Sequence, residues 1–146
     1  MKETKREARV HWAGDLRSGK GQVSTPSKAI DGALYSVSSR FEQGAGTNPE
    51  ELIAAAEASC FSMMLAKILS DQKKSVNKID TNATVVLRFD NGHAKISEVH
   101  LRTEAQVEGM DAESFRQAAE QAKENCPVST LLKPGLEKIT LEAKLA

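Results

Sequence analysis

The stretch NPEELIAAAEASCFSMMLAKILSDQ, residues 48–72, decides the fold because it predicts one long helix in the middle of the chain. Asn48 is a typical N-cap, and Pro49 suits the first helical position, where an N–H would have no helical partner in any case. Glu51, three residues after the cap, completes a capping-box pattern. From Leu52 to Leu69 the residues are apolar on most sides. We therefore expect a buried helix rather than one that lies on a surface.

Before this helix the sequence predicts short strands separated by turns. Residues 7–13 and 33–41 have extended patterns with a two-residue period, at Val10 and Trp12 in the first and at Tyr35 and Val37 in the second. Another strand is expected around residues 22–24. Stretches that contain glycine or proline, at residues 14–21 and 26–32, interrupt them. We expect these N-terminal strands to form an antiparallel sheet.

After the helix the hydrophobic period changes to the two-residue period of a strand. The turn sequence Asp90-Asn91-Gly92 predicts a β-hairpin, whose return strand covers about residues 94–107. Asp111 is expected to cap a second helix over about residues 112–125, and a last alternating strand follows at residues 136–145. One face of the second helix carries its apolar residues, which are Phe115, Ala118, Ala119 and Ala122.

The predicted fold class is α+β. It consists of N-terminal antiparallel strands, a long buried helix, a β-hairpin, a second helix and a final strand. A chain of 146 residues fits one compact domain, so we expect residues 1–146 to form a single domain.

The charge balance and the apolar pattern argue against two classes of protein. Twenty basic and twenty acidic residues give no net charge, whereas a nucleic-acid-binding domain usually shows a basic excess. No uninterrupted apolar run reaches the about 18–20 residues of a membrane span, and no apolar segment follows the charged N-terminus as in a secretory signal. We therefore expect a cytoplasmic protein that binds neither nucleic acid nor a membrane.

The two cysteines, Cys60 and Cys126, are the first candidates for chemistry. They are too few for a disulfide scaffold, and a static disulfide is improbable in a reducing cytosol. Three alternatives are open: two inert core thiols, part of a metal site, or a catalytic redox pair. The histidines show no metal-ligand spacing, so we expect neither a metal nor another cofactor. They are His11, His93 and His100.

The local surroundings of the two cysteines differ. Cys60 lies in the middle of the apolar helix, where an inert core residue is the simplest interpretation. As a reactive thiol it would need a cation from elsewhere, because the start of the helix is about ten residues away. Cys126 precedes Pro127 and could be the N-cap of a short helix, whose free N–H groups would favour its thiolate. On local physics alone Cys126 is the more acidic thiol, and a helix-ending residue without chemistry is the alternative.

Arg40 and Glu50 are two charged residues near the start of the long helix. Taken singly, Arg40 can be a solvated arginine, and Glu50 can be an acid that the helix dipole stabilises. Glu50 and Cys60 are about 15 Å apart along the helix axis, at 1.5 Å per residue, so one helix does not easily bring both to one site. A second subunit could place its own loop and helix start over Cys60. This geometry motivates the hypothesis of a homodimer.

Four motifs resemble those of the OsmC/Ohr family, which contains the osmotically inducible protein OsmC and the organic hydroperoxide resistance proteins. The motifs are Arg40-Phe41-Glu42, Gly46-Thr47-Asn48-Pro49-Glu50-Glu51-Leu52, Ala58-Ser59-Cys60-Phe61-Ser62-Met63 and Cys126-Pro127-Val128-Ser129. The segments His11-Trp12-Ala13-Gly14 and Gly19-Lys20-Gly21-Gln22-Val23-Ser24-Thr25 resemble the OsmC branch more than the Ohr branch. The likeness covers nearly the whole chain.

The resemblance implies an OsmC-like fold, an intertwined homodimer and a cysteine-based peroxidase of the stress response. In this family the cysteine that matches Cys60 is peroxidatic and the one that matches Cys126 is resolving. The residues that match Arg40 and Glu50 assist the attacking thiolate. The implied substrates are organic hydroperoxides and hydrogen peroxide, and the implied reductant is a dithiol such as a dihydrolipoyl protein.

Two other functions are alternatives to a peroxidase. A non-catalytic stress-response dimer would bind a ligand between apolar walls and keep both thiols inert. A cysteine hydrolase or acyl-transferase would need a histidine base near Cys60, and the three histidines lie on predicted strands or turns away from the long helix.

Overall fold

The computed structural model describes all residues from Met1 to Ala146. It divides into two compact units, an N-terminal unit of Met1–Leu52 and a C-terminal unit of Ile53–Ala146. The division falls within the first turn of the long helix, α2 (Pro49–Asp71). Each unit is described by itself below.

The N-terminal unit contains an antiparallel sheet of three short strands, as the sequence predicts. These are β1 (Arg9–Ala13), β2 (Lys20–Ser24) and β3 (Ala33–Tyr35), with β2 in the middle. Gly21 of β2 lies under the Tyr35 ring, which leaves no room there for a side chain. The Tyr35 ring is 5.5 Å from the Trp12 ring, measured between centroids. Val23 is the one apolar side chain that this unit buries.

The expectation of an extended chain over residues 33–41 is wrong beyond Tyr35. A short helix, α1 (Val37–Phe41), follows the strand. The reason is a reciprocal capping box: the Ser36 hydroxyl accepts from the Ser39 N–H at 3.2 Å, and the Ser39 hydroxyl accepts from the Ser36 N–H at 2.8 Å. The serines that give the sequence its strand-like alternation therefore satisfy the first N–H groups of a helix.

Helix α2 begins and ends close to the predicted positions. The Asn48 side-chain oxygen accepts from the Glu51 N–H at 2.8 Å, which confirms the predicted N-cap. The other half of the expected capping box is absent, because the Glu51 carboxylate accepts from the Thr47 hydroxyl at 2.7 Å instead. One face of α2 is buried within the chain, at Glu57, Phe61, Leu65 and Leu69. The opposite face is open, and Met63 there is 75% exposed, so burial on most sides does not occur within one chain.

The C-terminal unit is built on a three-stranded sheet. The predicted hairpin is confirmed: β4 (Ser75–Asp90) and β5 (His93–Glu108) pair antiparallel. Asn91 and Gly92 both have positive φ angles, 49° and 80°, as a type I′ turn requires. The last strand, β6 (Lys138–Leu145), pairs parallel with β5, which puts β5 in the centre.

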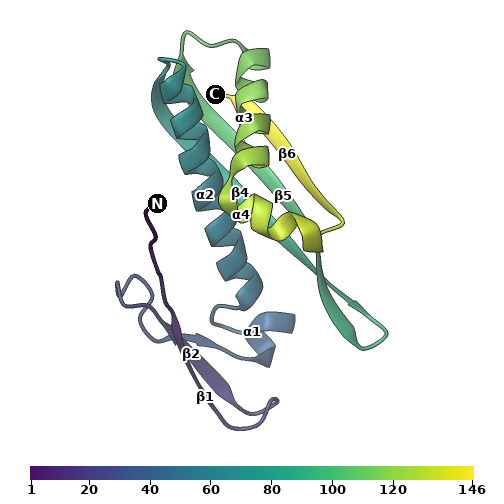
Figure 1. Cartoon of the computed structure of the whole chain (residues 1–146). Coiled ribbons are helices and arrows are strands. Elements are labelled where there is room, and N and C mark those ends of the chain that lie inside the picture. Colours follow the sequence, from purple (N-terminus) through teal and green to yellow (C-terminus); the bar gives the residue numbers. More distant parts are fainter. The chain divides into compact units, whose positions relative to one another are not determined.

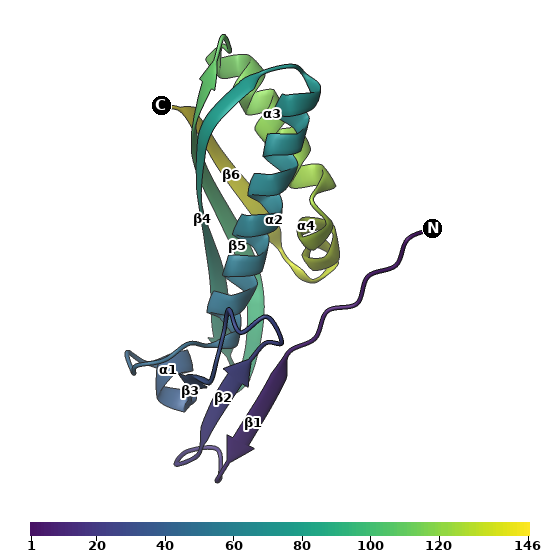
Figure 2. The ribbon, with the colours of Figure 1, turned by 90° about the vertical axis from the view of Figure 1, so that its left-hand side faces the viewer.

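Helices α3 (Ala112–Asn125) and α4 (Pro127–Leu132) and a 3₁₀ turn at Lys133–Gly135 connect β5 to β6. The Asp111 carboxylate accepts from the Ser114 N–H at 2.8 Å, so the predicted cap is confirmed. Helices α2 and α3 lie on the same face of the β4–β5–β6 sheet (Figures 1 and 2). The four residues predicted for the apolar face of α3 are all buried: Phe115, Ala118, Ala119 and Ala122.

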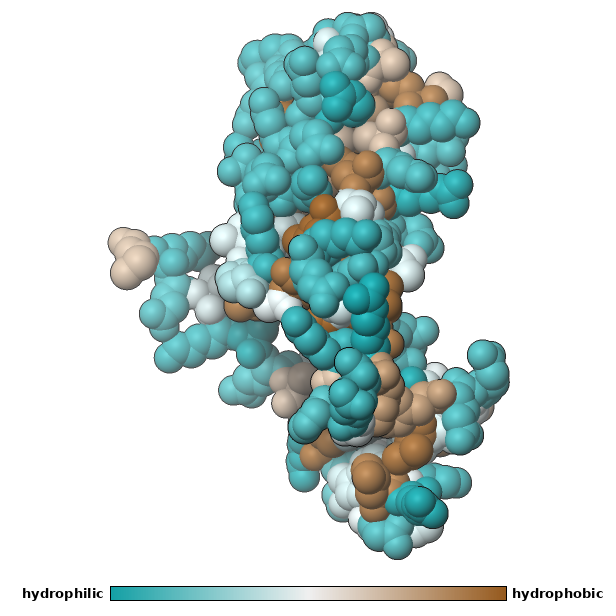
Figure 3. Space-filling model, turned by 90° about the vertical axis from the view of Figure 1, so that its right-hand side faces the viewer, coloured by the Kyte–Doolittle hydropathy of each residue, from teal (hydrophilic) through white to brown (hydrophobic).

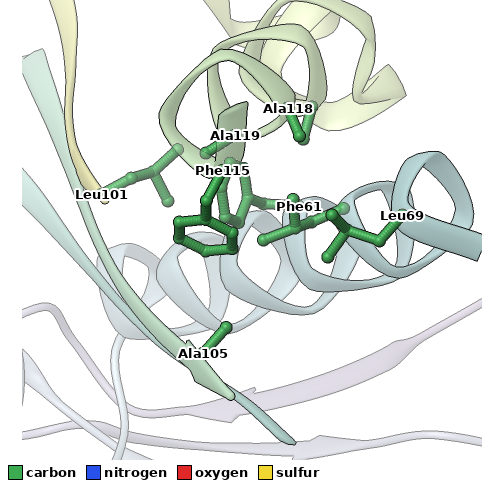
Figure 4. Close-up of a cluster of buried hydrophobic side chains, with 9 residues drawn as sticks. Phe61, Leu69, Leu101, Ala105, Phe115, Ala118 and Ala119 are labelled. Atoms are coloured by element: carbon green, nitrogen blue, oxygen red, sulfur yellow. The ribbon is translucent and has the colours of Figure 1, made fainter. Parts of the chain in front are cut away.

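The main core lies between these two helices and the sheet. Phe61 and Phe115 lie close together in it, with Leu69 on the α2 side and Leu101 and Ala105 on the strand side (Figure 4). Along β5 the residues facing the helices are buried, whereas the alternating residues, such as Arg102 and Glu104, are exposed. The sheet is therefore covered on one face only, which is common for antiparallel pairing.

Helix α2 is long and apolar enough to cross a membrane when it is judged by length and composition alone. This test is also passed by the core helix of a soluble protein. Glu57 and Lys67 interrupt the apolar run, and Phe61 and Leu65 of this helix belong to the core. The face of the molecule in Figure 3 is mostly hydrophilic, with hydrophobic atoms in separate patches. These features are those of a soluble fold.

Candidate active site

The structure brings the two cysteines together in the C-terminal unit. Cys60 lies in the middle of α2 and is half-buried, and Cys126 lies at the junction of α3 and α4 and is fully buried. Both are free thiols, and the Cys60 side chain is close enough to Cys126 to raise the pKa of its thiol. The Cys126 N–H ends α3 by donating to Ala122 at 2.9 Å, and Pro127 then begins α4, as predicted. Residues 66 positions apart in the sequence thus form a thiol pair.

A buried carboxylate completes this cluster. Glu57, one helical turn before Cys60, is 0% exposed. Its Oε1 accepts hydrogen bonds from the Ser129 hydroxyl at 2.5 Å and from the Cys126 thiol at 3.8 Å. Its Oε2 is buried without a partner. Sequence reasoning missed Glu57, although a lone acidic residue in an apolar helix, three residues before a cysteine, was a signal that could have found it.

The surroundings of Cys126 make it a weak acid. Burial raises the pKa of the Cys126 thiol above its ordinary value, and the hydrogen bond with Cys60 and the negative charge of Glu57 raise it further. Hydrogen bonds from the backbone and hydroxyl of Ser129 lower this pKa but do not outweigh the burial. The expectation that Cys126 is an acidic thiol is therefore wrong. A backbone N–H group at the start of α4 does lower the pKa of the Cys126 thiol, but desolvation raises this pKa by more.

The other two predicted site residues form an ion pair within the N-terminal unit. Arg40 in α1 donates to Glu50 at the start of α2, from Nη2 to Oε1 at 2.8 Å and from Nε to both carboxylate oxygens at 3.1 and 3.3 Å. Glu50 is buried, and the Arg40 side chain is 36% exposed. The guanidinium also lies 5.2 Å from the centre of the Phe41 ring. Such a fork-like pair fixes the direction of the arginine.

The loop between α1 and α2 is held in one conformation. The Asn48 amide donates to the Ser39 carbonyl at 3.1 Å, and the Ser39 hydroxyl donates to the Thr47 carbonyl at 2.7 Å. The Thr47 N–H donates to Leu34 of β3 at 2.8 Å. Gly46 has a φ of +119°, and a Cβ there would lie 2.4 Å from the Leu34 carbonyl oxygen. These contacts set the direction in which Glu50 enters α2.

The structure thus places the predicted site residues as two pairs, Cys60 with Cys126 and Arg40 with Glu50. Each pair lies within its own unit. A histidine base is not part of the thiol cluster. Both ring nitrogens of His100 are engaged in the sheet, with Thr140 at 2.6 Å and Glu98 at 2.9 Å. This arrangement disfavours a cysteine hydrolase.

Comparisons with known proteins identify relatives over most of the chain. The family model described as OsmC-like protein matches residues 42–141. Peroxiredoxin OsmC of Escherichia coli (strain K12) is 43% identical over 141 residues, which cover 96% of each chain. Organic hydroperoxide resistance protein-like 1 of Staphylococcus saprophyticus is 31% identical over 80% of this chain and 82% of its own.

Solved structures share the fold at lower sequence identity. An OsmC-like protein of unknown function from Vibrio cholerae covers 97% of this chain and 99% of its own, with a TM-score of 0.74 and 20% identity. The organic hydroperoxide resistance protein OhrB of Bacillus subtilis covers 96% of this chain and 98% of its own, with a TM-score of 0.69 and 23% identity.

Proposed function

Because this chain belongs to the OsmC-like protein family, we propose that Cys60 and Cys126 are the redox pair of a thiol-dependent peroxidase. The protein reduces organic hydroperoxides, in keeping with relatives named peroxiredoxin and organic hydroperoxide resistance protein. The observation that carries the assignment to these residues is the proximity of the two thiols, since Cys60 raises the pKa of the Cys126 thiol. Two cysteines that lie close together can form a disulfide without large movement of the chain.

Cys60 is the first to react. Its thiolate attacks the terminal oxygen of the hydroperoxide, the O–O bond breaks, and the alkoxide leaves and takes up a proton to become an alcohol. The sulfur is oxidised to a sulfenic acid while the peroxide is reduced. Cys60 suits this step better than Cys126 because it is half-buried and open to a substrate, whereas Cys126 is fully buried and its thiol pKa is raised.

Cys126 then resolves the sulfenic acid. Its sulfur attacks the Cys60 sulfur, an S–S bond forms, and the S–O bond breaks with release of water. An external dithiol reduces the disulfide by two exchange steps and returns both thiols. We propose a dihydrolipoyl protein as one such dithiol.

Arg40 and Glu50 serve the first step in this proposal. The attacking thiolate needs a cation, since Cys60 lies far from the positive end of its helix. Arg40 supplies the positive charge, and Glu50 fixes its direction through the paired hydrogen bonds. We propose that a second copy of the chain brings these two residues to Cys60.

The homodimer has support from burial. The N-terminal unit buries Val23 as its one apolar core side chain and leaves Val10 and Leu34 about half exposed, at 52% and 51%. A unit of this size with so small a core needs further apolar surface to pack against. The open face of α2, with Met63, is a surface of this kind in the second copy. We propose that the dimer is cytoplasmic and that both units act in one functional domain.

Replacement of each cysteine tests the assignment. We expect Cys60→Ser to abolish the consumption of cumene hydroperoxide in the presence of dithiothreitol. We expect Cys126→Ser to leave one turnover, after which intact-mass analysis finds a sulfenic acid at Cys60. Turnover by Cys60→Ser would refute the role of Cys60, and oxidation at Cys126 before Cys60 in the wild-type protein would reverse the two roles.

A non-catalytic dimer with inert thiols is the second candidate, and one observation favours it. Burial raises the pKa of Cys126, as expected of an inert core thiol. The reduced wild-type protein separates the two functions when it is mixed with one equivalent of cumene hydroperoxide. A Cys60–Cys126 disulfide is expected of the peroxidase, and two unmodified thiols are expected of the ligand-binding protein.

A further inference from the structure

Glu57 has no role in the chemistry described so far, and its burial is unfavourable for the stability of the fold. A carboxylate that is removed from water needs hydrogen bonds at both oxygens to offset the lost hydration. Oε1 of Glu57 has two donors, but Oε2 has none. An apolar side chain would fit the rest of this helix face, where Phe61, Leu65 and Leu69 follow at four-residue intervals.

The resolving step requires an acceptor for the proton of the Cys126 thiol, and Glu57 lies where it can be this acceptor. Attack on the sulfenic acid requires a thiolate at Cys126, because the thiolate is the nucleophile in disulfide formation. The Cys126 sulfur is fully buried, so bulk water cannot accept its proton. The contact at 3.8 Å makes the Glu57 carboxylate the acceptor of the S–H hydrogen bond.

We propose that Glu57 is the catalytic base of the resolving step, with the Ser129 hydroxyl holding Oε1 toward the Cys126 sulfur. This inference rests on the proposed function of the two cysteines. The proton of the Cys126 thiol moves to the Glu57 carboxylate as the S–S bond forms. The S–O bond of the Cys60 sulfenic acid breaks, and the departing hydroxide takes the proton from Glu57 and leaves as water. The carboxylate is thereby restored, and the step leaves the charge of the buried site unchanged.

Glu57→Gln is the variant that separates a base from a structural group. Glutamine has the same shape and keeps an oxygen that can accept from Ser129, but it does not take up the proton. With one equivalent of cumene hydroperoxide, followed by acid quenching and intact-mass analysis, the rates of sulfenic acid and disulfide formation are measured separately. We expect sulfenic acid formation at Cys60 to stay close to the wild-type rate. We expect disulfide formation to slow by about 100-fold or more, the usual effect of losing a general base.

The pH dependence of disulfide formation distinguishes the two roles, because loss of a merely structural group at position 57 would not change it. In Glu57→Gln the rate of disulfide formation should follow the thiolate fraction of Cys126, rising about tenfold per pH unit below the thiol pKa. In the wild-type protein the dependence should be weaker around neutral pH. Glu57→Asp keeps a carboxylate and should restore the wild-type profile at a reduced rate. Ser129→Ala should also slow disulfide formation and keep the wild-type profile.

The exposed Glu108 at the end of β5 provides a matched surface control, since Glu108→Gln makes the same substitution at a solvent-exposed position. A wild-type rate and pH profile of disulfide formation in Glu57→Gln would overturn the inference and leave the proposed function intact. If the wild-type protein itself forms neither sulfenic acid nor disulfide, the proposed function fails instead. If Glu57→Gln does not fold, Ser129→Ala provides the test. A disulfide-formation rate in Ser129→Ala that rises about tenfold per pH unit, as for an unassisted thiol, would contradict the role of the carboxylate.

Discussion

At the Cys126 sulfur, opposing effects set the protonation state. Burial, the hydrogen bond to Cys60 and the Glu57 charge favour the thiol, and the two hydrogen bonds from Ser129 favour the thiolate. The sum is a raised pKa, so the folded protein holds the Cys126 proton at pH values where the unfolded chain releases it. Folding stability is coupled to pH through this difference.

We predict that the free energy of unfolding falls as the pH rises above the ordinary cysteine pKa of about 8.5. Above that value the unfolded state binds fewer protons at Cys126 than the native state, so the slope of stability with pH is negative until the native pKa is reached. Urea unfolding of the reduced protein at about pH 7 and about pH 10 measures the loss, and Cys126→Ala should show a smaller one. Equal losses in the two proteins would contradict a raised pKa at Cys126.

The Arg40–Glu50 pair leads to a prediction about rate. Lysine keeps the charge but cannot donate to both carboxylate oxygens from a planar fork. We therefore expect Arg40→Lys to slow the reaction of Cys60 with cumene hydroperoxide by about tenfold, the equivalent of about 1.4 kcal/mol. The second-order rate constant of Cys60 oxidation is the measurement.

Arg116 on α3 makes the same kind of paired contact with Glu113 on an exposed surface, which makes Arg116→Lys a matched control. It should react at the wild-type rate. If the two lysine variants react equally fast, Arg40 does not assist Cys60.

How far the site could be predicted depends on the residue. Cys60, Cys126, Arg40 and Glu50 stand in motifs that can be recognised in the sequence. Glu57 does not, because its partners Cys126 and Ser129 are 69 and 72 positions away along the chain. Nothing local tells whether an acid in an apolar helix points into the core or out of it.

Among the secondary-structure elements, those with strong local signals were predicted and those decided by a few hydrogen bonds were not. The sequence Asn91-Gly92 favours a type I′ turn, and the apolar stripe at residues 115–122 favours a helix. The structure confirms both predictions. Helix α1 has only five residues. Its formation depends on the capping box of Ser36 and Ser39. The alternation of serine and apolar residues in this segment is also typical of a strand, so the sequence does not distinguish the two.

The loop that leads into α2 gives a prediction at this scale. Gly46→Ala should destabilise the protein by about 1–3 kcal/mol, because the residue would hold a strained positive φ and its Cβ would meet the Leu34 carbonyl. Gly32→Ala is the control: it also has a positive φ, of +67°, but nothing lies within 4 Å of its Cβ.

Trp12 is the single tryptophan and belongs to the same unit, so its fluorescence during urea unfolding reports the effect. Only the cost of backbone strain, about 1 kcal/mol, is expected for Gly32→Ala. An equal loss of stability in both variants would show that the approach of Gly46 to Leu34 is unimportant.

Over the whole molecule, the order of elements other than α1 followed from the sequence, but the environment of α2 did not. The mostly apolar sequence from Leu52 to Leu69 predicts burial on most sides, but a single chain covers one face. A sequence pattern records burial in the final assembly and does not distinguish cover by the same chain from cover by another. The open face around Met63 is consistent with the second explanation.

We therefore predict that the protein has a mass in solution of about twice the chain mass of 15.8 kDa, measured by light scattering after size-exclusion chromatography. Met63→Glu places a charge on the open face of α2 and should shift the protein toward monomer, since a buried unpaired charge is unfavourable in an interface. Leu16→Glu changes a residue of similar exposure, 71%, between β1 and β2 and should leave the mass unchanged. Because Arg40 is proposed to act across the dimer, Met63→Glu should also slow Cys60 oxidation. A monomeric wild-type protein with full peroxidase activity would refute both the dimer and the supply of Arg40 by a second copy.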